Sequence, residues 1–408
     1  MAGKAQIRFV MQNFRSVVQS DLEIKPITVL TGANGAGKSS FMYGVMALRN
    51  ILSNANQPAD NFFNLGFVNL GGIKEVVTEK DMTKPVILGW HHCDGATESS
   101  YFASIGPASF LRFTINKPLK VDMNLNVSFP YPLVQNVAQD VMWKDRKYRF
   151  TFNGITTTVV PLDGTVRSEV GEQPLAIIPK LIALSADFVD VKRGFFRNTY
   201  APLGTTSSGE DEVASLLGSD RDLEGRVSVV LQKLINKSFA TRHTALGAAT
   251  FYLQTTDRET GFVCDLVNEG FGVNQLVYLL AKILRKDVSL VCIEEPEIHL
   301  HPEALTKLAE QLVSIAKSDR KKFLIASHSE HFVVSLLNLV AKGTATVDDI
   351  AIHFVAKDKS NLTKITEQQI NEKGQIEGGL KSFYEPSIRA LEDFLGPQRD
   401  TEHVNPAK

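Results

Sequence analysis

Long hydrophobic runs and paired cysteines are both absent from this 408-residue sequence. No apolar run approaches the roughly 18 residues that a membrane-spanning helix needs. The first ten residues lack the apolar run and the small-residue cleavage site of a signal peptide. Three scattered cysteines, Cys93, Cys264 and Cys292, form neither a disulfide framework nor a CxxC metal site. We therefore expect a cytoplasmic protein with reduced thiols and no membrane contact.

An excess of charge of either sign is also missing, since the formal net charge is −1. The chain thus has no global basic field to attract nucleic acid. Local basic segments at 144–147, 192–197 and 320–322 keep DNA open as a partner, although such runs are more typical of solvated surfaces. Hydrophobic residues make up 43% and charged residues 22% of the sequence, which is the balance of a globular protein.

Hydrophobic spacing divides the chain into an α/β core that is interrupted by a β-rich region. Residues 1–92 and 256–366 have α/β texture, 93–255 form an inserted β/α region, and 367–408 form a C-terminal helix and tail. Alternation and apolar runs predict strands at 7–9, 27–30, 110–115, 121–129, 148–152, 156–160, 289–293 and 323–326. Helical spacing predicts helices at 39–52, 211–218, 223–237, 272–286, 303–316 and 382–394. No flexible linker flanks the inserted region, so we expect it to fold against the core.

A phosphate-binding loop follows the predicted strand 27–30. The pattern G-x-x-x-x-G-K-[ST] and the serine after it comprise Gly32, Ala33, Asn34, Gly35, Ala36, Gly37, Lys38, Ser39 and Ser40. Glycines allow backbone N–H groups to converge on a phosphate, and the following helix adds its N-terminal dipole. Lys38 is expected to reach the β- and γ-phosphates of ATP, and the Ser39 hydroxyl to hold Mg²⁺.

Two adjacent carboxylates end the apolar strand 289–293. Glu294 and Glu295 fall at the carboxyl edge of the predicted sheet, where open α/β folds bind ligands. Since neighbouring strand residues point in opposite directions, the two acids cannot share one role. We expect Glu294 to hold Mg²⁺ and Glu295 to polarise the attacking water.

Histidines mark two further positions. His328 ends the strand 323–326, where its imidazole can donate a hydrogen bond to a γ-phosphate. His299 and His301 form an HxH pattern in a loop between two prolines, but no complete metal-ligand set accompanies them. The alternative for that loop is a role at a dimer interface.

A glycine pair, Gly270 and Gly272, opens the predicted helix 272–286 within the run Asn268–Gln275. Glycines before a helix N-terminus favour an anion site. By itself this pattern also fits a simple turn, so its weight comes from its position just before the paired acids.

In order and spacing these motifs resemble the ABC-type ATPases, and specifically the stand-alone prokaryotic AAA-family ATPases related to SMC and RecF proteins. That group shares its core with the OLD nucleases and includes proteins of antiphage defence. The run Asn13–Ser16 resembles the N-F-[KR]-S element of the group, which implies that Arg15 lies near the adenosine side. The run Glu295–Pro302 is a specific mark of the group, and His328 matches its switch histidine.

The resemblance implies a mixed sheet and an ATP sandwich between two subunits, and hence a homodimer or a higher homo-oligomer. Its signature element matches Gly270, Gly272, Asn274 and Gln275, which would cap the γ-phosphate bound to the opposite subunit. Here Asn274 stands where a serine is usual, and Glu294 where an aspartate is usual. No Q-loop glutamine can be placed; the nearest segment by position, 71–75, contains none.

Three roles stay open for the ATP cycle. The first is control of a separate effector, such as a nuclease in antiphage defence, because the residues after His328 are too few for the OLD nucleases' Toprim domain. The second is DNA repair or DNA clamping of the RecF/SMC type. The third is a scaffold that needs ATP only to assemble.

Overall fold

The computed structural model describes residues 6–55, 57–93, 95, 98–107, 109–117, 120–126, 137–143, 146–152, 157–162, 185–202, 209–245 and 249–379. The helix predicted at 382–394 lies outside these residues. Within them, no helix is both long and apolar enough to cross a membrane.

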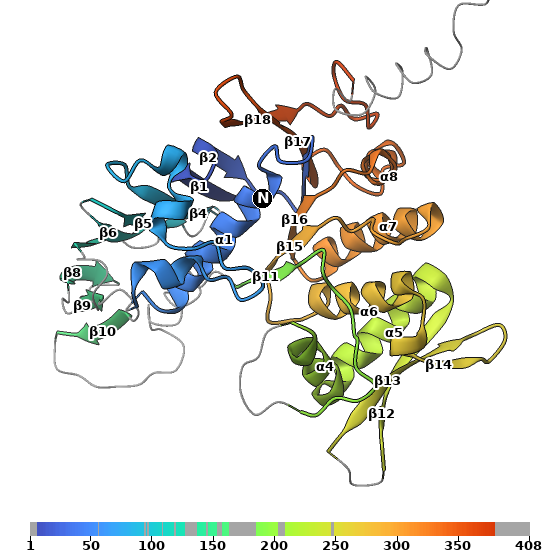
Figure 1. Ribbon diagram of the computed structural model, residues 1–408. Coiled ribbons are helices and arrows are strands. Elements are labelled where there is room, and N and C mark those ends of the chain that lie inside the picture. The colour runs from blue at the N-terminus through green and yellow to red at the C-terminus, as the bar shows by residue number, and fades with distance from the viewer. Residues whose placement is uncertain are drawn as a thin grey trace, which may run out of the picture.

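A six-stranded mixed sheet forms the centre of the molecule (Figure 1). Its strands, in spatial order, are β11 (Ala186–Val189), β15 (Leu290–Glu294), β16 (Lys322–Ala326), β3 (Ile27–Thr31), β17 (Ile350–Lys357) and β18 (Thr363–Gln368). All neighbours pair in parallel except β17 and β18, which are antiparallel. The strands predicted at 27–30, 289–293 and 323–326 are confirmed as β3, β15 and β16. Their continuous apolar runs suit a sheet that is covered on both faces.

Helices cover the two faces of this sheet unequally (Figure 1). One face packs on α1 (Lys38–Ser53), and the other packs against α6 (Phe271–Ile283), α7 (Pro302–Ser318) and α8 (Glu330–Ala341). Two more helices, α4 (Glu210–Ser219) and α5 (Arg221–Ile235), pack against α6 on the side away from the sheet. Alternation along β15 shows the division, because Leu290 and Cys292 join the core around α1 while Val291 and Ile293 join the core of the other helices.

A second, antiparallel sheet packs beside α1. Its order is β2 (Val17–Glu23), β1 (Gln6–Phe14), β4 (Val86–Cys93), β5 (Glu98–Ile105), β6 (Phe110–Lys117) and β7 (Val121–Asn126). Gly44 lets α1 approach this sheet closely, since a Cβ there would lie 2.8 Å from Met11 Sδ. Short turns of helix, η1 (Ala59–Phe63), α2 (Ile73–Val76) and η2 (Thr78–Lys80), connect α1 to β4.

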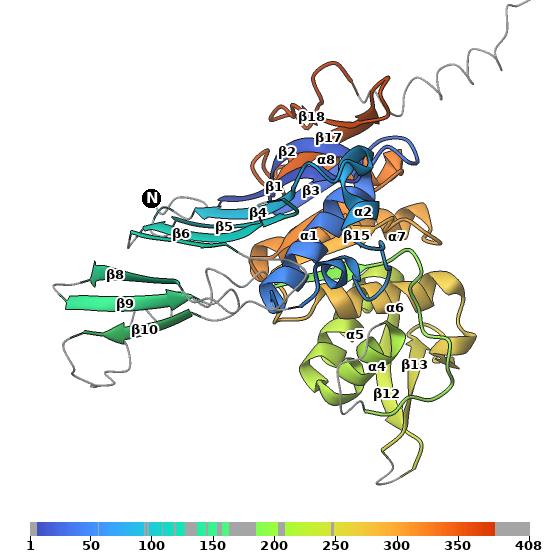
Figure 2. The same ribbon diagram turned by 60° about the vertical axis from the view of Figure 1, so that its left-hand side comes forward.

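Two three-stranded sheets extend from the core. Figure 2 shows β8 (Val137–Trp143), β9 (Arg146–Phe152) and β10 (Thr157–Pro161) projecting beyond β6. The other small sheet, β12 (Lys237–His243), β13 (Phe251–Asp257) and β14 (Val263–Asp265), lies against α5 and leads through η4 (Leu266–Asn268) into α6. Region 93–255 therefore contributes strands to the N-terminal sheet and, through β11, to the central sheet. Its boundaries at 92, 255 and 366 stay a prediction.

Candidate nucleotide-binding site

A cavity of about 440 Å³ opens at the carboxyl edge of the central sheet. It brings together most of the predicted site residues and adds others from β17 and the segment after β11. The lining comprises Arg15, Ser16, Asn34, Gly35, Gly37, Lys38, Ser39, Ser40, Tyr43, Val191, Glu294, Glu295, Ala326, His328 and Lys357. Residues 71–75, the nearest counterpart of a Q-loop, are not part of this lining.

The phosphate loop needs glycine at its bends. Gly32, Gly35 and Gly37 have φ angles of 141°, 74° and 110°, which side chains of L-residues rarely allow. At Gly32 a Cβ would also lie 2.0 Å from the carbonyl oxygen of Val355 on β17. The loop can therefore pass this close to β17 only with glycine at position 32.

The Lys38 side chain turns back to the start of the phosphate loop. Its Nζ donates hydrogen bonds to the carbonyl oxygens of Gly32 at 2.8 Å and Ala33 at 3.0 Å. Burial lowers the Lys38 pKa to about 8, against the opposing effect of Glu295, Glu297 and Glu294. Phosphate oxygens would favour the charged form of this ammonium group.

Thr363 ties the loop to two other segments. Its Oγ1 donates to the carbonyl oxygen of Ala36 at 2.8 Å and accepts from Ser16 Oγ at 2.7 Å. Its backbone N–H donates to the carbonyl oxygen of Ser16 at 2.7 Å. Arg15, next to Ser16, lies over the Tyr43 ring at 5.2 Å on the cavity wall. Its predicted place beside the adenosine stays a prediction.

The paired carboxylates occupy different environments, as their positions on the strand predict. Glu294 is only 7% exposed, and burial is the main cause that raises its pKa, while a hydrogen bond from Ser39 opposes the rise. Glu295 follows the strand with a left-handed φ of 43°, and its N–H donates to the carbonyl oxygen of Ala326 at 2.9 Å. Its Oε1 lies 3.5 Å from Nε2 of His328. Burial and the charge of Lys38 lower the His328 pKa, so the imidazole is neutral at pH 7.

Mg²⁺ fits the donors that meet here. The Ser39 hydroxyl and the Glu294 carboxylate are hard oxygen ligands in contact with each other. Mg²⁺ in nucleotide sites takes one or two protein ligands and completes its shell with phosphate and water. In the described part of the chain, no three His, Cys, Asp or Glu side chains converge as metal ligands. In the HxH loop, His299 Nδ1 lies 3.2 Å from Gln275 Oε1, and the His301 side chain caps the N-terminus of α7.

Two side chains that were not among the predicted site residues hold the carboxylate side in place. Glu297 Oε1 accepts hydrogen bonds from Ser327 Oγ at 2.8 Å, His328 N at 2.7 Å and Ser329 N at 3.0 Å. Arg193, only 2% exposed, donates to the carbonyl oxygens of Glu294 and Glu295, both at 2.8 Å.

The predicted signature residues lie outside the cavity, at the start of α6. Asn274 is 4% exposed, and its Nδ2 donates to the carbonyl oxygens of Phe195 at 2.8 Å and Leu266 at 3.0 Å. Both N–H donors of this side chain are therefore used within the chain, and which residue of the element donates to a phosphate stays a prediction. Glycine at position 272 also has a structural explanation, because a Cβ there would lie 2.4 Å from the carbonyl oxygen of His299.

The exposed part of this element is shorter than the motif suggests. Gly270 precedes the first turn of α6, and the exposed Asn268 lies two residues before it. Gln275 is 7% exposed and contacts His299.

Comparison with known proteins agrees with this architecture. A family model described as AAA ATPase domain matches residues 208–333, which include the paired carboxylates. An Smc head bound to the C-winged helix domain of ScpA aligns with a TM-score of 0.50 and 10% identity, over 90% of this chain and 98% of that chain. Residues 208–333 thus match an ATPase domain, and the fold of the chain is that of an Smc head.

Further similarities are weaker. The SMC head domain from Thermotoga maritima gives a TM-score of 0.41 at 10% identity, over 91% of this chain and 100% of that chain. A Pyrococcus furiosus-derived Smc head with an extended coiled coil, bound to the C-terminal domain of ScpA, gives 0.46 at 8% identity, over 96% and 100%. Large ribosomal subunit protein bL9 of Ruegeria sp. (strain TM1040) is 28% identical over 149 residues, which are 35% of this chain and 69% of that protein. At that coverage of this chain, the last similarity assigns it no role.

Proposed function

We propose that this ATPase binds MgATP between two copies of itself and uses the cycle to control a separate effector protein, a nuclease in antiphage defence. One observation supports the dimer. The cavity holds the phosphate loop, both carboxylates and His328, whereas Gly270 at the start of α6 lies outside it. A site assembled from both elements needs a second subunit.

The residues of one cavity have distinct tasks in this proposal. Loop amides and Lys38 bind the β- and γ-phosphates, and Glu295 accepts the proton of the attacking water. His328, 3.5 Å from that carboxylate, donates a hydrogen bond to the γ-phosphate. Ser39 and Glu294 would hold Mg²⁺, which neutralises phosphate charge when bound. In the second subunit, the Asn268 amide and the N-terminus of α6 replace Asn274 as donors to the γ-phosphate.

The contacts and burial of residues in the basic segments favour control of an effector over DNA clamping. Lys147 lies 3.5 Å from Asp140, Arg193 is buried against backbone carbonyls, and Lys321 is 3% exposed. Arg193 and Lys321 are therefore committed to contacts within the chain, whereas the Lys147 side chain is 58% exposed and Lys192 and Arg320 lie at the surface. Stimulation of ATP turnover by DNA, falling steeply with salt, would instead support the clamp.

Solution mass tests the dimer directly. We expect the parent to be a monomer without nucleotide and Glu295→Gln to form a lasting dimer with MgATP, while Lys38→Ala stays monomeric. An unchanged mass in Glu295→Gln with ATP bound would contradict the proposal. Assembly of the parent that equals that of Glu295→Gln under turnover conditions would support a scaffold instead. Co-purification of a nuclease with the ATP-bound Glu295→Gln dimer would identify the effector.

Mixing two inactive variants tests whether each ATP site is shared between two subunits. Lys38→Ala damages the phosphate loop, and Gly270→Glu damages only the element presented to the partner. Mixed in equal amounts, the two inactive variants should recover about a quarter of the parental turnover, because half of the dimers regain one intact site. No recovery in mixtures that do form dimers would exclude a shared site.

A further inference from the structure

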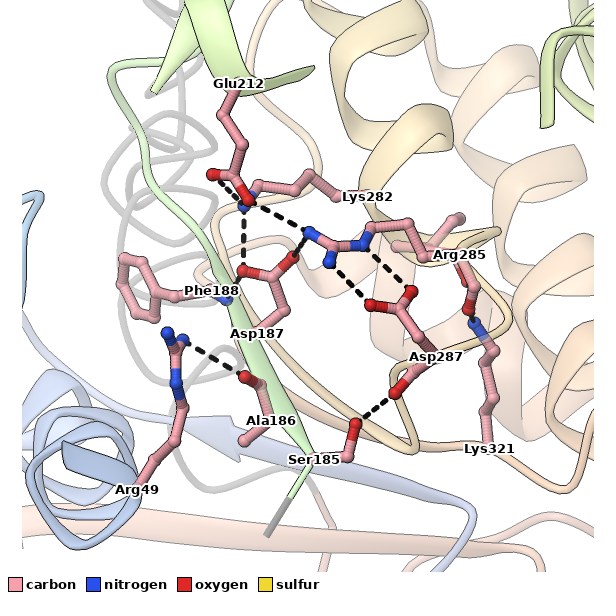
Figure 3. Close-up of polar contacts among 11 residues, drawn as sticks. Arg49, Ser185, Ala186, Asp187, Phe188, Glu212, Lys282, Arg285, Asp287 and Lys321 are labelled. Atoms are coloured by element: carbon pink, nitrogen blue, oxygen red, sulfur yellow. Dashed lines mark hydrogen bonds and ion pairs between the residues drawn. The ribbon is translucent and has the colours of Figure 1, made fainter. Parts of the chain in front are cut away.

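The two edges of the central sheet make different contacts. At the β11 edge, the buried Asp187 accepts hydrogen bonds from Lys282 Nζ at 2.7 Å and Arg285 Nη1 at 3.2 Å (Figure 3). These contacts join β11 to α6 and the residues after it, and none of the residues labelled in Figure 3 lines the nucleotide cavity. At the opposite edge, β17 and β18 form a hairpin that contacts the phosphate loop itself.

The hairpin meets the phosphate loop at both of its ends. Val355 of β17 approaches Gly32 so closely that a Cβ there would lie 2.0 Å from the Val355 carbonyl oxygen. Thr363, the first residue of β18, is 8% exposed, and its Oγ1 would lie 2.3 Å from a Cβ on Gly37. The hairpin is therefore in direct contact with the loop, and its side chains can determine the loop's conformation.

A chain of hydrogen bonds runs from Ser16 through Thr363 to the loop. Thr363 Oγ1 lies 2.8 Å from the carbonyl oxygen of Ala36 and 2.7 Å from Ser16 Oγ. Because a carbonyl oxygen only accepts, the single hydroxyl proton of Thr363 goes to Ala36, and Ser16 must donate its own proton to Thr363. Consecutive hydroxyl groups polarise one another, which strengthens the bond to Ala36. Ser16 is also held by its backbone, whose carbonyl oxygen accepts from the Thr363 N–H at 2.7 Å.

This chain of hydrogen bonds sets the direction of the peptide group between Ala36 and Gly37. The Ala36 C=O and the Gly37 N–H belong to one planar trans peptide, so they point in opposite directions. With the carbonyl oxygen held by Thr363, the N–H points away from β18. Within the described residues no backbone carbonyl accepts from this N–H, and Gly37 lines the cavity whereas Ala36, 4% exposed, does not. The Gly37 N–H is therefore free to bind a phosphate oxygen.

Without the bond from Thr363 this peptide group could rotate. Its rotation changes only ψ of Ala36 and φ of Gly37, and glycine adopts both signs of φ at little cost. The rotated peptide would present the Ala36 carbonyl oxygen to the cavity in place of the N–H, and a carbonyl oxygen cannot donate to a phosphate. The direction of the peptide thus decides whether the loop gains or loses one phosphate ligand.

We infer that Ser16 and Thr363 are positioning residues that keep the Gly37 N–H directed at the phosphates of the bound nucleotide. The inference rests on the proposed binding of MgATP in this cavity, and not on the dimer or the effector. It gives Ser16, the last residue of the run Asn13–Ser16, a role on the phosphate side of the site. Thr363 acts through the loop backbone, so its loss should weaken phosphate binding and leave the groups that hydrolyse ATP in place.

The test compares two threonines of β18. Thr363→Val removes the hydroxyl and keeps the size of the side chain, Thr363→Ser keeps the hydroxyl, and Thr366→Val changes an exposed threonine on the same strand. We expect Thr363→Val to bind MgATP about ten-fold more weakly, with turnover at saturating ATP within about three-fold of the parent. Thr363→Ser should stay within about three-fold of the parental affinity, and Thr366→Val should match the parent. Parental affinity in Thr363→Val, or an equal loss in either of the other variants, would overturn the inference.

Inorganic tripolyphosphate separates the phosphate contacts from the rest of the site, because it has no adenosine. We expect Thr363→Val to weaken its binding about ten-fold as well, measured with Mg²⁺ by titration calorimetry on the full chain. A role in stability alone would lower the free energy of unfolding and leave the affinity of the folded protein for tripolyphosphate unchanged. That result would overturn the inference, whereas a parent that binds neither ATP nor tripolyphosphate would overturn the proposed function instead.

Ser16→Ala tests the chain of hydrogen bonds. The Thr363 hydroxyl then keeps its bond to Ala36 but loses its polarising partner, so we expect the affinity for ATP to fall about three-fold. The double variant Ser16→Ala, Thr363→Val should bind about as weakly as Thr363→Val alone, because both changes act on one bond, and additive losses would contradict the chain. Should Thr363→Val not unfold cooperatively in urea, Ser16→Ala replaces it, and parental affinity for tripolyphosphate in that variant would overturn the inference.

Discussion

The two sides of the nucleotide cavity are built in different ways. The phosphate-loop side is local, because Gly32 to Ser40 are contiguous and Lys38 bonds back to the loop's own carbonyl oxygens. The carboxylate side is assembled from distant parts of the chain, with Arg193 holding Glu294 from a position 101 residues earlier. The loop side thus depends on backbone conformation and the carboxylate side on buried polar contacts, so substitutions should affect binding and turnover separately.

The largest effect is expected on the loop side, at Gly32. A methyl group there would meet the Val355 carbonyl oxygen at 2.0 Å, so Gly32→Ala should destabilise the protein by at least about 3 kcal/mol and abolish ATP binding. Gly35→Ala is the matched control, because its Cβ would have nothing within 4 Å and only its φ of 74° opposes the change. We expect a cost of about 1 kcal/mol there, measured by urea unfolding. Equal losses at the two glycines would contradict the role of the β17 contact.

On the carboxylate side, Glu297→Ala should separate turnover from binding. It removes the acceptor of three hydrogen bonds that fix Ser327, His328 and Ser329. Turnover should fall about ten- to a hundred-fold while ATP affinity changes less than about three-fold. Glu303→Ala, an exposed acid in the first turn of α7, is the control and should change neither quantity. A parallel loss of affinity in Glu297→Ala would mean that the two sides are not separable.

The pH dependence of binding sharpens the assignment of Lys38. Its pKa is about 8 in the free protein and rises when phosphate binds, so binding takes up a proton above pH 8. ATP affinity should therefore be constant below about pH 7, be about halved at pH 8 and fall by up to about thirty-fold as pH rises toward 9.5. Titration calorimetry in buffers of different ionisation enthalpy would show the proton uptake. A pH-independent affinity in the parent would remove Lys38 from the phosphate contacts.

A smaller effect is expected at Lys357, which the motifs do not include. This exposed lysine ends β17 on the cavity wall and has no ion pair among the described residues. Lys357→Ala should weaken ATP binding about three-fold at low salt and less at high salt, with turnover at saturation unchanged. Lys359→Ala, also exposed but outside the cavity lining, is the control.

What the sequence predicts follows the same division. The loop, the strand before it and the paired acids were found because each is a short contiguous pattern with a fixed geometry. The contacts of Thr363, Glu297 and Arg193 were missed, since they join segments far apart in the chain. Glu297 itself lies in the run Glu295–Pro302, but that pattern does not show its partners. The charged residues that follow β11 were the local signal for Arg193.

The contacts of Asn274 were not predictable for the same physical reason. Its position relative to Gly270 matches the serine of the signature element, and tertiary packing turns its amide toward the Phe195 backbone. Periodicity places a residue on a helix and does not show which buried backbone group will capture its side chain. Asn268 in the same run is exposed, and only its exposure distinguishes it from the buried Asn274. The sequence pattern does not show that difference.

The most direct measurement determines ATP affinity and turnover for Lys38→Ala and Glu295→Gln under identical conditions. We expect Lys38→Ala to lose measurable binding, whereas Glu295→Gln should bind MgATP as the parent does and hydrolyse it at least about a hundred-fold more slowly. Parental turnover in Glu295→Gln, or equal losses of affinity in the two variants, would contradict the division of the site into a binding side and a hydrolytic side.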